Sequence, residues 1–279
     1  PLFRDAYGPL LRHQAKVPSP DARLAPQGAS PSEQALAAAN ALDAYLASNH
    51  EATAALIVEP MVQGAAGMAM HDPAYLTRAR ELCTRYEVHL IADEIMTGFG
   101  RTGPMFACEH AGVAPDMLCL SKGITGGYLP LSVVLTRDEI YQAFYDDDLA
   151  RGFLHSHSYT GNALACRAAL AVLDLFRHND VLEANRVSAA RLDELARPLA
   201  THPKVENFRR LGMIWAFEVA IGRGGRRDDF AHWFAAEALR REMLLRPIGR
   251  TVYWMPPYCL KPDEMEILAS RTMEIVACA

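Results

Sequence analysis

The sequence predicts an α/β fold: a mainly parallel sheet covered by helices, followed by a smaller α+β domain at the C-terminal end. Four apolar runs are continuous rather than alternating, which is typical of strands buried on both faces. Segments with helical spacing lie before and between them, and beyond about His178 helices mix with short strands. The 279 residues, 51% hydrophobic and 22% charged, can bury a core of two domains.

The larger domain is expected to occupy residues 1–178. Its first 31 residues hold six prolines and little periodicity, so they should form a loop or extended arm. Organised structure should begin near Ser32, where apolar residues recur at helical spacing. In order, the pattern predicts a helix over 34–48, a strand over 54–59, a helix over 73–86, strands over 88–93, 117–121 and 131–136, and a helix over 162–176.

The smaller domain is expected to occupy residues 179–279. Its pattern predicts a helix over 180–199, strands over 205–211 and 213–219, a helix over 229–241, a short strand over 252–255 and a closing helix over 262–276. The glycine- and arginine-rich stretch from Gly222 to Arg227 is expected to be a flexible linker.

Composition and charge exclude several classes of partner. With 28 basic and 33 acidic residues the formal charge is -5, and no block of like charge favours a nucleic acid or an anionic membrane. No apolar run approaches the roughly 20 residues of a membrane span. The 6 cysteines are scattered without a CxxC pair, so we expect a reducing, cytoplasmic location.

Asp93 and Lys122 each follow an apolar run of the predicted sheet. Because the carboxyl ends of parallel strands meet at one edge, we expect both side chains to face the same crevice. A carboxylate and an amine in this arrangement are what pyridoxal phosphate requires, one for its ring nitrogen and one for its aldehyde. Of the four lysines in the chain, only Lys122 follows a buried strand. The spacing therefore indicates an aminotransferase.

The residues around this pair also resemble a known signature. Residues 90–103 read Leu-Ile-Ala-Asp-Glu-Ile-Met-Thr-Gly-Phe-Gly-Arg-Thr-Gly, with Pro115-Asp116 and Ser121-Lys122-Gly123 downstream. This pattern resembles the class III aminotransferases, which are pyridoxal-phosphate enzymes of fold type I. The resemblance covers essentially the whole chain. It implies that Lys122 is the catalytic residue and binds the aldehyde, and that Asp93 binds the pyridine nitrogen.

Three further segments, residues 59–68, 106–110 and 246–258, resemble the biotin-pathway branch of the class. That resemblance implies transfer of an amino group from S-adenosylmethionine to 8-amino-7-oxononanoate, giving 7,8-diaminononanoate. It also implies that Arg246 binds the carboxylate of the keto substrate, which suits the planar fork of a guanidinium. Tyr253 would line the same pocket. Arg101 would either contact substrate or anchor its loop, and the sequence favours neither role over the other.

The segment before the 162–176 helix resembles the one that, in this class, reaches across a homodimer interface to the partner's cofactor phosphate. Ser158 matches the usual threonine and Ser156 a glycine at the substrate, while His157 replaces a proline. We expect a homodimer with shared active sites and cofactor contacts from His157 and Ser158. His155 and His157 have no third ligand spaced near them, so no metal site is expected.

Class members carry about 150 residues, the size of a typical domain, before the position matching Pro1, including a phosphate loop and an aromatic residue that stacks on the cofactor. We therefore expect these 279 residues alone to bind the cofactor weakly or not at all. Two alternatives stay open. One is another class III ω-aminotransferase with a diamine, lysine or β-amino acid donor; the other is a non-catalytic fragment whose crevice serves binding or assembly.

Overall fold

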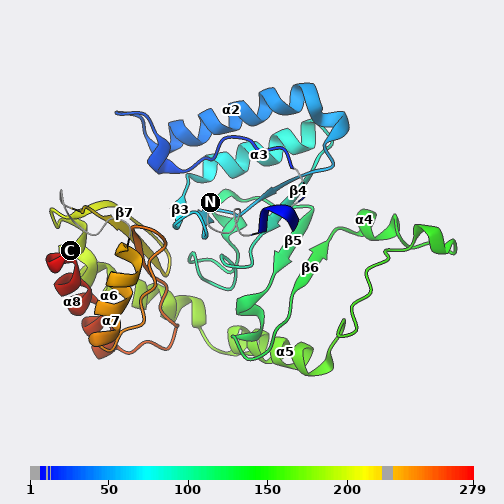
Figure 1. The fold of residues 1–279 in the computed structure, drawn as a ribbon. Coiled ribbons are helices and arrows are strands. Elements are labelled where there is room, and N and C mark those ends of the chain that lie inside the picture. The colour runs from blue at the N-terminus through cyan, green and yellow to red at the C-terminus, as the bar shows by residue number, and fades with distance from the viewer. Residues whose placement is uncertain (1–6, 11, 13, 222–228) are drawn as a thin grey trace.

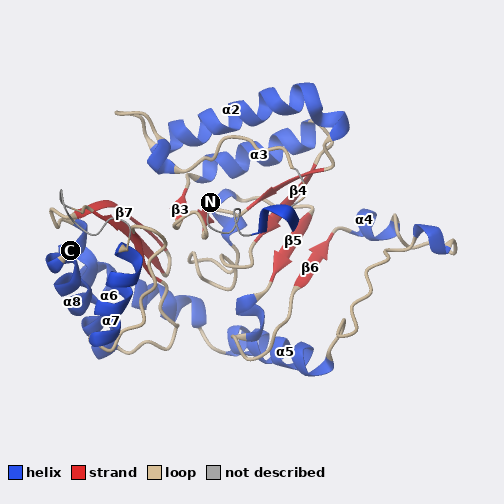
Figure 2. Cartoon of the chain, in the orientation of Figure 1, coloured by secondary structure: helices blue, strands red, loops and turns tan. Residues whose placement is uncertain are grey.

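The computed structural model describes residues 7–10, 12, 14–221 and 229–279, and Figures 1 and 2 show how their elements are arranged. The expected linker from Gly222 to Arg227 lies outside the described residues. The extended arm expected at the start contains two short 3₁₀ turns, Gly8–Leu10 and Ala22–Leu24.

A four-stranded sheet positions the residues of interest. Its order is β1, β4, β5, β6, formed by Ala55–Val58, His89–Asp93, Met117–Leu120 and Val133–Thr136. The first three strands are parallel, with Val58 beside Ala92 and Asp93 beside Cys119, whereas β6 runs antiparallel to β5. The expected mainly parallel sheet is therefore confirmed, with one strand reversed.

Helices α2 (Pro31–Asn49) and α3 (Pro73–Arg85) cover one face of this sheet, at the top of Figure 1. Ser30 and Glu33 form a capping box that starts α2. Asp72 caps α3 ahead of Pro73, whose fixed φ suits a first helical turn. The other face is less covered in the described chain, since Ile57 and Val134, which point to that face, are 62% and 59% exposed.

The chain between β6 and helix α5 (Ala163–His178) extends away from the sheet in Figure 1 and carries the short helix α4 (Asp138–Gln142). Asn162 caps α5 by accepting from the N–H groups of Leu164 and Ala165. Large apolar side chains are exposed along this stretch, including Leu149, Phe153 and Leu154 at 87%, 71% and 86%.

The C-terminal part is an antiparallel sheet packed against three helices. Strands β7 (Val205–Leu211), β8 (Ile214–Val219) and β9 (Thr251–Trp254) follow in that order, and α6 (Val181–Ala200), α7 (Phe230–Arg240) and α8 (Pro262–Cys278) complete the layer. The fully buried Trp215 and Trp254 satisfy their ring N–H groups with Asp193 and Thr272. The expected mixture of helices and short antiparallel strands is confirmed.

We propose a domain boundary near residue 178, the end of α5, as the sequence predicts. One buried cluster draws only on residues 189–276, and another only on residues 35–108. A third, smaller cluster joins the two parts: it combines Met61 and Met68 with Ile214 and Ala216 of β8. The short hairpin of β2 (Val62–Gln63) and β3 (Ala69–Met70), which the sequence analysis missed, supplies this junction.

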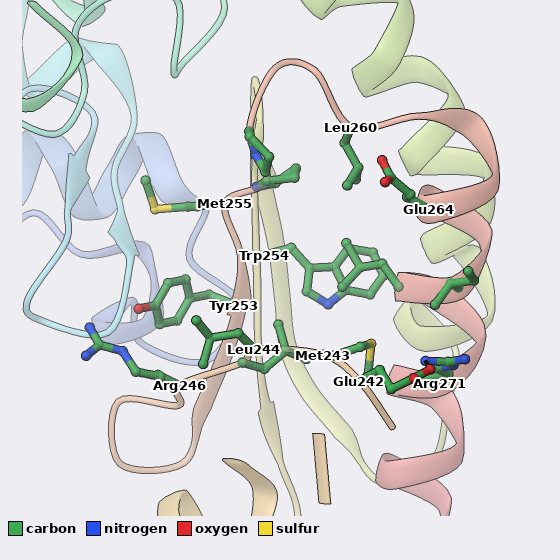
Figure 3. A pocket seen from close by; sticks show the side chains of 15 residues that line it. Glu242, Met243, Leu244, Arg246, Tyr253, Trp254, Met255, Leu260, Glu264 and Arg271 are labelled. Atoms are coloured by element: carbon green, nitrogen blue, oxygen red, sulfur yellow. Dashed lines mark hydrogen bonds and ion pairs between the residues drawn. The ribbon is translucent and has the colours of Figure 1, made fainter. Parts of the chain in front are cut away.

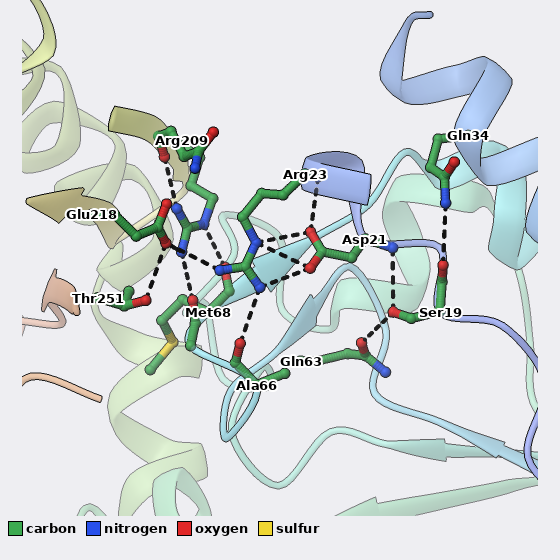
Figure 4. A network of polar contacts seen from close by, with 12 residues as sticks. Ser19, Asp21, Arg23, Gln34, Gln63, Ala66, Met68, Arg209, Glu218 and Thr251 are labelled. Atoms are coloured by element: carbon green, nitrogen blue, oxygen red, sulfur yellow. Dashed lines mark hydrogen bonds and ion pairs between the residues drawn. The ribbon is translucent and has the colours of Figure 1, made fainter. Parts of the chain in front are cut away.

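A partly buried network of charges ties the N-terminal arm to the C-terminal sheet (Figure 4). Arg23 pairs with Asp21 at 2.7 Å and with Glu218 of β8 at 3.1 Å. The same Glu218 oxygen accepts from Arg209 at 2.9 Å and from Thr251 at 3.1 Å. Burial opposes ionisation of Glu218, but Arg209 and the hydrogen bonds prevail and lower its pKa.

The two arginines of this network also hold the loop between β2 and β3. Arg23 donates to the Ala66 carbonyl at 3.0 Å, and Arg209 donates from Nε to the Met68 carbonyl at 2.8 Å. Backbone carbonyls that the hairpin leaves unpaired are thereby satisfied. Glu218 therefore organises three segments that are far apart in the sequence.

Candidate active site

Asp93 and Lys122 lie at the carboxyl ends of the adjacent parallel strands β4 and β5, as the sequence predicts. One oxygen of Asp93 accepts the Ile95 N–H at 3.1 Å, and its other oxygen has no protein hydrogen bond in the described residues. Lys122 is exposed and makes no hydrogen bond or ion pair within the same part of the chain. A carboxylate oxygen and an amine are thus both available to a ligand.

Lys122 adopts a left-handed backbone conformation, with φ of +44°. Side chains with a Cβ rarely adopt this region, at a cost of about 1–3 kcal/mol, and such strain clusters at functional sites. The strained residue begins a 3₁₀ turn, Lys122–Thr125, directly after β5. The turn redirects the chain at the point where the amine is presented.

Glu59 joins this pair and was missed by the sequence analysis. It follows β1 directly, and because Val58 is paired with Ala92, Glu59 comes beside Asp93. Burial, and then the charge of Asp93, raises the pKa of Glu59, while the Gly64 N–H and the charge of Lys122 oppose the rise. The signal was available: Glu59 closes its apolar run as Asp93 closes the next.

The loop after Asp93 is built around Glu94, which is completely buried. Its two oxygens accept from Thr97 Oγ1 at 2.9 Å and from the N–H groups of Ala107 and Cys108, both at 2.8 Å. A buried carboxylate with three donors is well satisfied and rigid. This arrangement fixes the backbone that carries Asp93.

Arg246 and Tyr253 lie together on one side of β9, while Trp254 points to the opposite side into the core (Figure 3). They line a cavity of about 560 Å³ with Leu244, Met255 and Pro256. The lining also includes residues on the opposite side of the strand, namely Trp254, Leu260, Glu264 and Arg271. Arg246 is exposed and has no ion pair in the described residues. Its guanidinium is free to meet an anion beside a largely apolar wall.

Tyr253 packs against a cluster rich in methionine, which the sequence analysis did not foresee. Met61, Met68, Met70, Met96 and Met255 belong to it, together with residues of β8. Met96 lies only three residues after Asp93, and Gly64 faces its side chain closely, since a Cβ there would be 3.2 Å from Met96 Cε. The cluster therefore connects the Asp93 loop with the pocket of Arg246.

Arg101 anchors its loop in this structure. Its Nη1 donates to the Pro256 carbonyl at 2.9 Å, and its guanidinium lies over the ring of Tyr258, 4.6 Å from the centroid. Burial lowers the pKa of Arg101, opposed by Tyr258. The geometry supports the anchoring reading, and a contact with substrate stays a prediction.

Ser156, His157 and Ser158 are all exposed in the extended segment before α5. The Nδ1 atom of His157 accepts the Tyr159 N–H at 3.2 Å, which stabilises a local turn. Figure 1 shows this segment running clear of the sheet, so the described chain does not bring these residues to Lys122. Their expected contacts with a cofactor phosphate stay predictions.

Comparison with known proteins decides the family. The family model for class-III aminotransferases matches residues 2–276. The chain belongs to the class-III aminotransferases. This family consists of pyridoxal-phosphate-dependent transaminases, so the family and cofactor implied by the sequence motif are confirmed.

Several class-III relatives carry one name. The adenosylmethionine-8-amino-7-oxononanoate aminotransferases of Nitratidesulfovibrio vulgaris and Helicobacter pylori are 42% and 41% identical, over 96% and 99% of this chain. The chain covers only 50% and 62% of these relatives. It thus spans about half to three fifths of the length of the curated proteins it matches.

Solved class-III structures share the fold. The Methanocaldococcus jannaschii enzyme of the same name superposes with a TM-score of 0.87 at 30% identity, covering 100% of this chain and 63% of that one. An amine transaminase from an uncultivated Pseudomonas species, solved with pyridoxal phosphate bound, has a TM-score of 0.83 at 34% identity and covers 94% and 61%. The fold-type I prediction is confirmed.

The residues present fit the cofactor of a class-III aminotransferase. The free oxygen of Asp93 can accept from a protonated pyridine nitrogen, and the unpaired Lys122 amine can bind an aldehyde. Within the described residues, no three His, Cys, Asp or Glu side chains gather in a way that could hold a metal ion. No helix in that part of the chain is both long and apolar enough to cross a bilayer.

Proposed function

We propose that this aminotransferase moves an amino group from S-adenosylmethionine to 8-amino-7-oxononanoate, giving 7,8-diaminononanoate in biotin biosynthesis. The observation that carries the amino-transfer chemistry is the pairing of a half-free Asp93 carboxylate with an unpaired Lys122 amine at the ends of adjacent strands. The names of its relatives and the Arg246 pocket support the choice of substrates.

Asp93 and Lys122 would divide the chemistry. Pyridoxal phosphate, when bound, supplies an electron sink for the bond broken at the amine-bearing carbon. Asp93 would keep the ring nitrogen protonated; a carboxylate about 3 Å from a cation contributes roughly 5 kcal/mol at an effective dielectric near 20, before desolvation. Lys122 would hold the aldehyde and, once a substrate amine displaces it, carry the proton between carbon atoms.

Arg246 and Tyr253 would form the substrate end of the site, beside the loop that Arg101 anchors. Arg246 would take the carboxylate of the oxo acid through two parallel hydrogen bonds, and Tyr253 would line the aliphatic part of the pocket. The apolar lining of the cavity, with Leu244 and Met255, suits the aliphatic chain of that substrate.

We also propose a cytoplasmic homodimer with shared active sites, in which Ser156, His157 and Ser158 reach the partner's cofactor and substrate. Their exposure in a segment that leaves its own sheet supports this arrangement, as do the large apolar side chains exposed around them. Light scattering on the purified holoenzyme tests the dimer, and a monomer that retains full activity would contradict it.

The test is the visible absorbance of the purified full-length protein, because these 279 residues alone are expected to bind the cofactor weakly or not at all. Adding S-adenosylmethionine should remove the band of the bound cofactor, and adding 8-amino-7-oxononanoate should restore it. Loss and return of the band would demonstrate both half-reactions. A band that ignores S-adenosylmethionine but responds to lysine or a diamine would assign a different donor, and no band at all would favour a non-catalytic role.

The second candidate is an ω-aminotransferase acting on other amines. It is favoured by the similarity to amine and ω transaminase structures, for example 27% identity and a TM-score of 0.86 to the Pseudomonas jessenii enzyme solved with pyridoxamine phosphate. The same absorbance experiment with lysine, a diamine and β-alanine separates the two candidates.

A further inference from the structure

The loop after Asp93 and the segment after Tyr253 bind each other reciprocally. Tyr258 Oη donates to the Phe99 carbonyl at 2.8 Å, and Arg101 Nη1 donates to the Pro256 carbonyl at 2.9 Å. The Arg101 guanidinium also lies over the Tyr258 ring. Each segment therefore uses one side chain to hold the backbone of the other.

Phe99 is the residue that this contact holds in place. Its φ is +58°, in the left-handed region that bulky residues rarely adopt, and its side chain is buried, 4% exposed. Such a conformation persists only where the surroundings fix it. The hydrogen bond from Tyr258 to the Phe99 carbonyl is the side-chain contact that fixes it from the C-terminal part of the chain.

The ring of Phe99 lies against the backbone that follows Lys122. A Cβ added at Gly123 would be only 2.9 Å from Phe99 Cδ2 and 3.0 Å from Phe99 Cβ. Lys122 is itself strained, with φ of +44°. The left-handed Phe99 therefore lies against the residue that directly follows the left-handed Lys122, and the position of the Phe99 ring limits the path of the chain there.

We propose that Tyr258 is a positioning residue: by holding Phe99 it fixes the backbone at Lys122 and Gly123, and so the direction of the Lys122 amine. This inference rests on the proposed function of Lys122. Arg101 contributes by keeping the Tyr258 ring in place, which gives the anchoring of its loop a role in the site. No part of the sequence motif around Asp93 contains Tyr258.

Tyr258 is suited to remain a donor. Burial raises the pKa of its hydroxyl, opposed by the charge of Arg101. The proton needed for the bond to Phe99 therefore stays in place well above neutral pH.

The test compares Tyr258→Phe with a matched control in the holoenzyme. Tyr258→Phe removes one hydroxyl and keeps the ring that Arg101 covers. The control, Tyr86→Phe, removes a hydroxyl that donates to Asp43 of α2 at 2.7 Å. Tyr86 packs with the apolar cluster of α2 and α3, whereas Phe99 belongs to a different cluster. For each, we would measure kcat, KM and the pH dependence of the visible absorbance of the bound cofactor, which reports the surroundings of the Lys122 amine.

Tyr258→Phe should lower kcat about tenfold and change KM less than about twofold. The pH at which the visible absorbance of the bound cofactor is halfway through its change, called the absorbance midpoint below, should shift by about half a pH unit or more. The control should behave as the wild type in all three measurements. A Tyr258→Phe enzyme with the wild-type kcat and midpoint would overturn the proposal, as would a control that reproduces its effects.

Gly123→Ala is a second variant, which changes the contact between Phe99 and Gly123 at the Gly123 side. Its added methyl group must displace the Phe99 ring, so it should also shift the midpoint. Because both changes act through Phe99, the double variant should show less than the sum of the two shifts. Full additivity would contradict a shared route through Phe99.

The outcomes for this inference and for the proposed function are distinguishable. A wild type without a cofactor band refutes the proposed function and this inference with it. A wild type with a normal band that responds to amino donors, together with an unchanged Tyr258→Phe variant, refutes only the positioning role.

Discussion

At the scale of single residues, the site depends on which carboxylate oxygens already accept hydrogen bonds from the protein. Asp93 offers one free oxygen, whereas the neighbouring Glu94 has both oxygens bound by the loop it organises. Two adjacent carboxylates thus have different tasks because the backbone turns between them. Only the first can serve a ligand.

Asp93→Asn should abolish most of the activity while leaving the fold intact. The amide keeps the shape and can still accept the Ile95 N–H, but it no longer offers a charge to a protonated ring nitrogen. We expect kcat to fall by about 10² to 10⁴, in the range of lost electrostatic or proton-transfer groups. Asp72→Asn is the control, since asparagine caps a helix as well as aspartate, and its kcat should be unchanged.

Asp116 should control stability at low pH. Burial opposes its ionisation, but the Leu90 N–H, Arg80 and Arg137 outweigh burial and lower its pKa to about 2. Because the folded pKa lies below the unfolded value, its stabilisation is present above about pH 4 and is lost as the pH falls toward 2. The shift corresponds to about 2 kcal/mol.

Urea unfolding at several pH values measures this effect. At pH 7 the wild type should exceed Asp116→Asn by about 2 kcal/mol, and the difference should shrink steadily below pH 4. The exposed Asp138→Asn should show no such gap. A difference that is constant with pH would show that packing, not ionisation, explains the role of Asp116.

At the scale of elements, the tight turn between β7 and β8 docks on the loop that carries Arg101. Gly212 has φ of +55°, and a Cβ there would be 2.3 Å from the Thr102 carbonyl carbon. The Met213 N–H donates to the Arg101 carbonyl at 2.9 Å next to this contact. The small residue allows two backbones to touch.

Gly212→Ala should therefore destabilise the protein more than backbone strain alone explains. Gly249 provides the control, because its φ is +59° but nothing lies within 4 Å of its added Cβ. We expect Gly249→Ala to cost about 1 kcal/mol and Gly212→Ala about 3 kcal/mol or more in free energy of unfolding. Equal losses would mean that the loop moves aside without cost.

Most elements were predictable because their signals are local. Continuous apolar runs marked β1, β4 and β5, and Pro73 marked the start of α3. The start of α2 was placed at residue 34, three residues late, because Pro31 was assigned to the arm and the capping box of Ser30 and Glu33 was not used. The antiparallel direction of β6 was not predictable, since direction depends on the chain path and not on the apolar run itself. The two-residue strands β2 and β3 were missed because two residues carry no periodicity.

The residues of the candidate site also fall into those with a local sequence signal and those without one. Asp93 and Lys122 were predicted as site residues because each follows or closes an apolar run, and the same signal would have singled out Glu59. Tyr258 closes the 246–258 segment noted in the sequence, but its positioning role could not be predicted, because its contact with Phe99 joins residues 159 positions apart. Only the folded chain shows such a contact.

At the scale of the whole molecule, the Glu218 network decides how the arm, the β2–β3 loop and the C-terminal sheet stay together. Removing one partner from a largely buried group of charges leaves the remaining charges less well compensated. Glu218→Gln should therefore leave Arg23 and Arg209 facing a neutral amide and cost about 3 kcal/mol in free energy of unfolding.

Glu206→Gln is the matched control, because its bond to Arg250 joins side chains that are 52% and 46% exposed. Its loss should be below about 0.5 kcal/mol. Thermal or urea unfolding of both variants measures the difference. Similar stabilities for the two would show that the arm docks through its apolar residues and not through Glu218.

The methionine cluster that packs against Tyr253 has a consequence for the sensitivity of the protein to oxidation. Thioether side chains are unbranched and polarisable, so this wall can change shape when one substrate replaces another in the proposed reaction. The same sulfur atoms accept oxygen, and a sulfoxide would place a polar group in a buried apolar cluster. Adaptability toward two ligands would thus make the pocket sensitive to oxidative damage, with repair depending on methionine sulfoxide reductases.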